Sequence, residues 1–290
     1  MIFDWYWLVV ASAILMTIAT LVEKAALKAE HATQFSAAFS WIIAIVSLAF
    51  LPWASFDISS FQWLLLIVGS ILWSANYLIT ARIYKHGSVS IATSVSSAVP
   101  LMIIVILAYF FLSEYLSTIQ YLAIIGIIAA TYLALFRKGK SMLADFDKDK
   151  YRYLMVVNSV LAAVSTIIGK YQLVNINIFA YLLITQLLMA GEFAIFISAK
   201  YGGLKEIGQT ARKYAVPLVA VVALTIGYRL TYYSALAQIA VPISIAAPLR
   251  STIFTVLTVV AGGMLFREQG MKWKIMLSVV MVALAFILTM

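Results

Sequence analysis

The chain has 290 residues, of which 64% are hydrophobic and only 11% charged, and its mean hydropathy is +1.04. A soluble domain is about half apolar and a quarter charged, and a disordered chain has low hydrophobicity, so both classes are excluded. With no cysteine and only His31 and His86, the chain lacks thiolate sites, disulfides and the usual histidine sets for a metal. These figures predict an integral membrane protein with no cofactor and no bound metal.

Long apolar runs predict an all-α polytopic protein with ten transmembrane helices, because a bilayer core about 30 Å thick needs roughly 20 apolar residues per helix. A transmembrane barrel would show short alternating strands instead. The first five helices are expected at Trp5–Leu27, Thr33–Leu51, Phe61–Arg82, Val89–Leu112 and Thr118–Phe136. The second five are expected at Tyr153–Leu173, Ile178–Ala199, Ala215–Gln238, Ile243–Phe266 and Met271–Met290.

The basic residues are distributed unevenly between the predicted loops. Loops after the odd-numbered helices carry most lysines and arginines, whereas loops after the even-numbered helices and both chain ends carry none. The positive-inside rule then predicts a multi-pass protein of the plasma (inner) membrane, with the basic loops in the cytoplasm and both termini outside. The net charge of +9 is thus a topology signal, and no nucleic-acid partner is expected.

The two halves of the chain resemble each other weakly in sequence. A shift of 154 residues pairs Glu114 with Glu268, and a shift of 146 pairs Lys24 with Lys170. Because each half has an odd number of helices, the two repeats must have opposite orientations, as in alternating-access transporters. The predicted divisions are a first five-helix repeat (1–136), a charged cytoplasmic linker (137–152) and a second five-helix repeat (153–290).

One segment carries a family resemblance. In SVSIATSVSSAVPLMIIVILAYFFLSEYLS, residues 88–117, small residues lead to Pro100, and Glu114 closes the helix about fourteen residues later. This segment resembles the fourth helix of the drug/metabolite transporter superfamily, EamA type. The second copy, 243–268, keeps the small residues and the glutamate but has Phe254 where the proline should be.

The resemblance extends over the whole chain in length and in its five-plus-five organisation. It implies a small-molecule carrier with a central cavity lined mainly by the first, third, fourth, sixth, eighth and ninth helices. Many members of that superfamily export amino acids or related metabolites, and others move sugar phosphates, nucleotide sugars or cationic drugs. Members of this kind often have cytoplasmic termini, whereas the charge distribution here predicts the reverse.

Arg229 and Arg250 lie inside predicted spans, where an ionisable group costs at least about 2.5–3.5 kcal/mol. Both lie roughly 10–14 Å below the same predicted outer face. Two guanidinium groups at one depth repel, so we expect an anion between them, and a substrate carboxylate or phosphate fits the planar fork of arginine. The alternative is structural, with each arginine bonded to helix carbonyls, tyrosine hydroxyls or an acid.

Aromatic and small polar residues on the neighbouring predicted helices complete the expected site. These side chains alternatively fill helix interfaces, which is the usual role of serine and threonine in membrane helices. No residue is expected to be catalytic. The predicted substrate-binding residues are Arg229, Arg250, Tyr77, Asn76, Trp73, Tyr228, Tyr232 and Ser94.

Two further charged residues are candidates for coupling or ion pairing. Glu192 is interpreted as the only acid well inside a predicted span, either as a proton-coupling carboxylate or as a static partner of Arg229 or Lys170. Lys170 lies near a predicted helix end and has no basic neighbours on its side. It is either a cavity residue or a lysine that extends to the membrane surface.

These observations predict a secondary-active transporter, an exporter or exchanger of a small metabolite with an anionic group, working by alternating access. Amino acids and organic or phosphorylated anions are the candidate substrates. The alternatives are a flippase of a lipid-linked phosphate head group and an exporter of cationic drugs. An enzyme is not expected, because the aspartates lie in loops or termini and neither histidine is inside a span. The expected partners are the substrate and the bilayer, and monomer and homodimer both remain open.

Overall fold

The computed structural model describes residues 5–27, 32–86, 89–134, 136–137, 140–141, 149–200, 204–266 and 271–288. Almost all of this is helical, as expected for apolar segments whose backbone polar groups must be satisfied within each segment. The first-half helices are α1 (Trp5–Leu27), α2 (Ala32–Ser47), the 3₁₀ helix η1 (Leu48–Trp53), α3 (Ser60–His86), α4 (Val89–Leu112) and α5 (Thr118–Ala134). The second-half helices are α6 (Asp149–Asn175), α7 (Ile178–Lys200), α8 (Leu204–Lys213), α9 (Ala215–Leu236), α10 (Ile243–Phe266) and α11 (Met271–Ile287).

The all-α class is confirmed, and the chain has many apolar helices. Over the described residues, seven segments are long and apolar enough to cross a membrane: α1, α2 with η1, α3, α6, α7, α9 and α10. Three more apolar segments are shorter there, namely Val99–Leu112, Thr118–Leu133 and Ile275–Ile287. The count of ten spans therefore stays a prediction.

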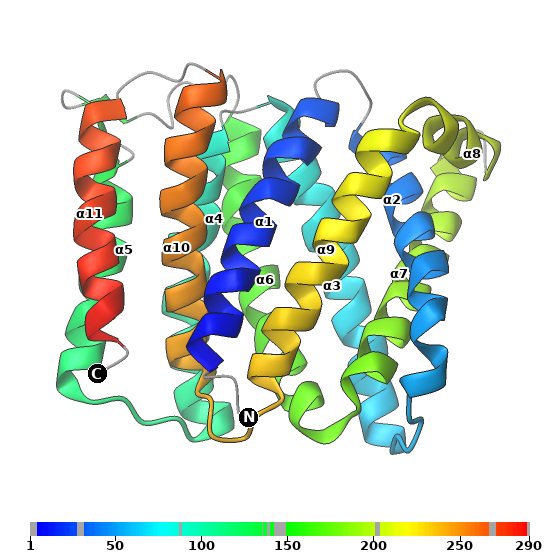
Figure 1. Ribbon diagram of the computed structural model, residues 1–290, viewed down its shortest axis with the longest axis horizontal. Helices are drawn as coiled ribbons and strands as arrows, with labels where there is room; N and C mark the ends of the chain where they lie inside the picture. The colour runs from blue at the N-terminus through cyan, green and yellow to red at the C-terminus, as the bar shows by residue number, and fades with distance from the viewer. Residues whose placement is uncertain are drawn as a thin grey trace.

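The long helices form two layers (Figure 1). In one layer α11 packs against α10, α10 against α1, α1 against α9, and α9 against α2. In the other layer α5 packs against α4, α4 against α6, α6 against α3, and α3 against α7. Contacts of α5 with α11, α4 with α10 and α2 with α7 join the layers. Each layer thus mixes helices from both halves of the chain.

Three local expectations were wrong. The predicted helix Thr33–Leu51 ends as an α-helix at Ser47 and continues as η1, which contains Pro52. Because proline lacks an amide hydrogen, it removes a helical hydrogen bond. The expected loop before α9 contains α8, whose Ile207 and Thr210 are buried while Lys205 and Arg212 are exposed.

The third correction concerns the linker, where Phe136–Arg137 (β1) and Lys140–Ser141 (β2) form a short antiparallel pair. Phe136 was expected to end a helix. Residues 142–148 of the predicted linker lie outside the described residues.

One end of the bundle, where Figure 1 marks both chain termini, is fixed by side chains that cap helices. The hydroxyl–amide pairs Ser59–Gln62 and Ser117–Gln120 are capping boxes at the starts of α3 and α5. After α4, Ser113 adopts a left-handed φ of 54°, and the next residue, Glu114, accepts hydrogen bonds at the start of α10. These contacts determine where the helices around the central cavity begin.

Candidate functional site

A cavity of about 210 Å³ lies between the two layers. Its walls come mainly from α1, α3, α6, α9 and α10, with two residues of α4 and Tyr181 of α7. Apart from α7, these are the six helices that the superfamily resemblance implies, and their place in the cavity wall agrees with that expectation. Seven of the eight predicted substrate-binding residues line this cavity: Trp73, Asn76, Tyr77, Tyr228, Arg229, Tyr232 and Arg250.

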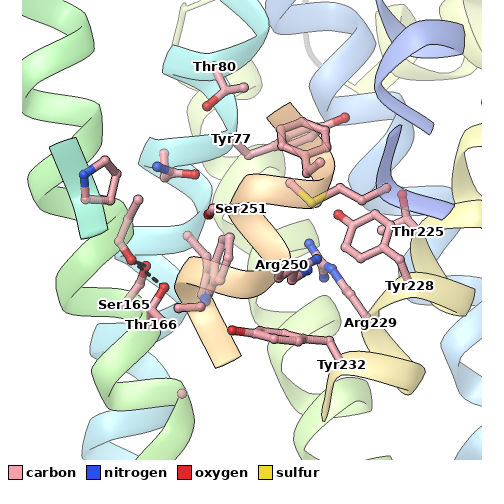
Figure 2. A pocket seen from close by; sticks show the side chains of 18 of the residues that line it. Tyr77, Thr80, Ser165, Thr166, Thr225, Tyr228, Arg229, Tyr232, Arg250 and Ser251 are labelled. Atoms are coloured by element: carbon pink, nitrogen blue, oxygen red, sulfur yellow. Dashed lines mark hydrogen bonds between the residues drawn. The ribbon is translucent and has the colours of Figure 1, made fainter. Parts of the chain in front are cut away.

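The two arginines enter the cavity from adjacent sides (Figure 2). The guanidinium carbon of Arg250 lies 4.0 Å from the ring centre of Tyr232 and 5.3 Å from that of Tyr228. The guanidinium carbon of Arg229 lies 5.8 Å from the ring centre of Trp73. Aromatic rings attract cations over their faces, so these three rings hold both charges in place.

Neither arginine has a carboxylate partner among the residues that the structure describes. Arg229 is only 6% exposed, and the buried Nε of Arg250 has no hydrogen-bond partner. Buried charges are normally paired, because an unpaired charge loses its hydration without compensation. The buried Arg229 and the half-buried Arg250 face one cavity, which makes the site suited to an anion.

Asn76 is part of a hydrogen-bond network between α3 and α6. Its Nδ2 donates to the backbone oxygen and to Oδ1 of Asn158, both at 3.1 Å. Asn158 in turn donates to the hydroxyl of Thr80 at 2.9 Å. Asn76 therefore lines the cavity and also joins the two helices, and its contact with substrate stays a prediction.

The two coupling candidates lie away from the cavity wall. Glu192 of α7 accepts hydrogen bonds from Ser70 at 2.6 Å and Ser74 at 2.5 Å, both on α3. Lys170 donates to the backbone oxygens of Leu236 at 2.7 Å and Gln238 at 3.0 Å, at the end of α9. Their coupling role is a prediction that these contacts leave open. The side chain of Ser94 on α4 lies outside the described part of the structure.

Glu23 is a cavity residue that the sequence interpretation missed. It is 7% exposed, lies one turn before the end of α1 and lines the cavity. The sequence interpretation thus considered Glu192, the acid well inside a span, and left out an acid that is buried near the end of one. The signal was present in the spacing, because Met16, Ala19, Thr20 and Glu23 recur every three or four residues and line one wall.

A metal centre receives no support from the described residues, where no group of three or more metal-ligating side chains occurs. The polar chemistry of the cavity is instead that of two guanidinium groups, one carboxylate and several tyrosine hydroxyls. Such a set binds and orients a small polar molecule.

Comparison with known proteins places this fold. Residues 4–136 match the model of the EamA-like transporter family, whereas no curated protein matches the chain. One solved structure, described as "Crystal structure of protein", has a TM-score of 0.71 and 14% identity, covering 98% of this chain and 96% of that chain. At this identity the likeness shows the fold alone. The family is one of transporters, which implies a carrier rather than an enzyme. Residues 4–136 of this multi-pass membrane protein, just under half of the chain, thus resemble the EamA-like transporter family, in agreement with the drug/metabolite transporter resemblance.

Proposed function

We propose that the chain is a secondary-active transporter, an exporter or exchanger, of a small metabolite that bears an anionic group. Amino acids and organic or phosphorylated anions are the candidate substrates. The observation that carries this proposal is the pair Arg229 and Arg250, which line one cavity with no carboxylate partner among the described residues. A substrate anion supplies the missing partner.

Stacking also determines how the anion is bound. The rings of Tyr228 and Tyr232 lie against the guanidinium of Arg250, so its in-plane N–H groups remain available as donors. In-plane donors are the ones that form paired hydrogen bonds to a carboxylate or phosphate. The buried Nε without a partner belongs to this set. The site therefore favours a planar or tetrahedral oxyanion over a neutral ligand.

An inverted repeat of ten spans, moving by alternating access, is part of the same proposal. The helix contacts support it. If each helix of the first half (α1–α5) is matched in order with one of the second half (α6, α7, α9, α10 and α11), the main contacts between helices occur in corresponding pairs. The contact of α1 with α9 then becomes that of α6 with α3, and α1 with α10 becomes α6 with α4. The cavity lies between these exchanged pairs, which is where a repeat-based transporter binds its substrate.

Thermal stability in detergent tests the anion site. Purified protein is titrated with a panel of carboxylated and phosphorylated metabolites, and the melting temperature is recorded. A ligand at a hundred times its Kd stabilises by about 2.7 kcal/mol, which gives a measurable rise. Arg229→Gln and Arg250→Gln are expected to abolish that rise. Arg82→Gln is the matched control, because Arg82 bonds Thr33 on α2 and does not line the cavity. A rise that survives in both cavity variants would overturn the proposal.

Orientation needs a separate measurement. We expect the basic loops to face the cytoplasm and both termini to face outward. A reporter that is active only outside the cytoplasm, fused after Met290, should therefore be active. The same reporter placed after Lys213 should be silent. The opposite pattern would reverse the orientation and leave the cavity assignment unchanged.

A further inference from the structure

Glu23 brings a carboxyl group into the cavity that holds the two arginines. It is 93% buried, since only 7% of its surface is exposed, and its Oε1 has no hydrogen-bond partner. The hydroxyl of Tyr77 lies beside the carboxyl group and interacts with it, and no other hydrogen-bond partner is seen for that hydroxyl. A buried carboxyl group loses its hydration, and a single tyrosine hydroxyl replaces that hydration only in part.

The surrounding cations do not account for this carboxylate. The neighbouring Lys24 directs its ammonium group to the backbone oxygen of Tyr84 on α3. Arg229 and Arg250 lie against aromatic rings farther along the cavity. The cavity thus has an acidic part at Glu23 and a basic part at the arginines.

Helix register gives the separation of the two parts. The hydroxyl of Ser12 on α1 donates to the backbone oxygen of Tyr228 at 2.8 Å, so Ser12 lies level with the start of the Arg229 turn. Glu23 is eleven residues further along α1, which is roughly 16 Å at the usual helical rise. Helical side chains lean toward the helix N-terminus, and the antiparallel helices α1 and α9 therefore lean these two groups toward each other. The charged groups then lie on the order of 10–12 Å apart.

Tyr77 connects the two parts. Its hydroxyl is within electrostatic range of both Glu23 and Arg229. Met16, Ala19 and Phe254 provide apolar wall in the same cavity. An acidic part, a basic part and an apolar wall match a ligand with opposite charges on a short hydrocarbon chain.

We propose that Glu23 binds the ammonium group of the substrate while Arg229 and Arg250 bind its anionic group. This inference rests on the proposed function of the arginine pair and names the substrate class for that site. Two salt-bridge contacts of roughly 3–4 Å each leave roughly 2–6 Å for the ligand itself, centred near 4 Å. The centre of that range corresponds to a zwitterionic amino acid with two or three carbon atoms between its charged groups, whereas an α-amino acid, with one carbon, lies at its lower edge.

The test compares probes that differ in one group. 4-Aminobutanoate and 4-hydroxybutanoate share the carboxylate and the chain, but only the first has an ammonium group. In thermal titrations of the full-length protein, 4-aminobutanoate is expected to raise the melting temperature half-maximally at a concentration at least tenfold lower than 4-hydroxybutanoate or alanine. In the Glu23→Gln variant, 4-aminobutanoate and 4-hydroxybutanoate are expected to raise the melting temperature at equal concentrations. The control is Asp57→Asn, which removes an exposed carboxylate in the loop before α3, outside the cavity wall.

A second variant tests the geometry without removing the charge. Glu23→Asp withdraws the carboxylate by one methylene group, so the preferred probe should shift from 4-aminobutanoate to 5-aminopentanoate. This variant also covers the case in which Glu23→Gln fails to fold. If Glu23→Asp still preferred 4-aminobutanoate, or if the wild type preferred alanine, the inferred distance between Glu23 and the arginines would be wrong.

The outcomes separate this inference from the proposed function. Equal responses to the amino and hydroxy probes in the wild type, or a preference retained in Glu23→Gln, would overturn the role of Glu23. If the hydroxy probe still depends on Arg229 in that case, the anion site stands. A carboxylate response that is independent of both arginines would overturn the proposed function itself.

Discussion

The two halves of the chain carry the same groups at their helix ends and different groups at the cavity. Lys24 donates to the backbone oxygen of Tyr84, and Lys170 donates to that of Gln238. The lysines are 146 residues apart and the acceptors 154, which are the two shifts that align the halves in sequence. Within each half, a lysine on the first helix therefore holds the end of the third helix.

The charges in the cavity do not follow this repetition. At the same shifts, the counterparts of the three charged cavity residues are small: Ala75 for Arg229, Ser96 for Arg250 and Gly169 for Glu23. Helix anchoring is thus present twice, whereas ligand chemistry is present once. From this difference we expect stability and ligand binding to depend on separate residue sets, which can be changed independently.

The largest effect on stability is expected from Glu114→Ala. Glu114 accepts hydrogen bonds from the backbone amides of Ile243 at 2.9 Å and Ser244 at 2.8 Å, and from the Ser244 hydroxyl at 2.5 Å. Its charge also lies at the positive end of the α10 dipole. Losing a charged acceptor of this kind is expected to lower the free energy of unfolding by about 3 kcal/mol, measured by SDS-driven unfolding in micelles.

Glu114→Ala is also informative about the comparison, because the response to 4-aminobutanoate should remain. The exposed loop residue Asp57 supplies the control, and Asp57→Ala should change stability by less than about 0.5 kcal/mol. If Glu114→Ala removed the ligand response without unfolding the protein, anchoring and binding would not be separate.

A smaller and matched pair of effects is expected from Lys24→Met and Lys170→Met. Each variant removes an ammonium donor from carbonyl oxygens at a helix end and keeps a long apolar side chain. Charged hydrogen bonds contribute about 1.5–3 kcal/mol, and values inside membranes are lower, so each loss is expected near 1–2 kcal/mol. Melting temperatures of the two variants should fall by similar amounts. A difference above about 1 kcal/mol would mean that the halves are not equivalent in this role.

The sequence was sufficient to predict the long apolar helices and the two arginines that line the cavity, but not the helix α8. Arg229 and Arg250 were identifiable because hydrocarbon disfavours charge, whatever the fold. The partners of Glu192 were not predicted, because sequence gives the depth of a residue in the membrane but not which helix lies next to it. In the structure Glu192 accepts hydrogen bonds from Ser70 and Ser74 of α3. Glu23 was missed because it precedes Lys24 near a helix end, where charged residues usually reach the membrane surface.

The smallest effect is expected at Gly169, the counterpart of Glu23. A Cβ there would lie 3.1 Å from the Tyr181 hydroxyl, closer than ordinary contact, whereas a Cβ at Gly69 would lie 3.4 Å from Ile168. Alanine is favoured over glycine inside a helix by about 1 kcal/mol. Gly69→Ala should therefore raise the free energy of unfolding by up to that amount, while Gly169→Ala should change it little, because Tyr181 has to move. Tyr181 also packs edge-on against Tyr233, with ring centres 5.3 Å apart, which limits that movement. Equal stabilisation in the two variants would show that this wall tolerates a side chain, and that the missing second carboxylate is a matter of charge rather than of space.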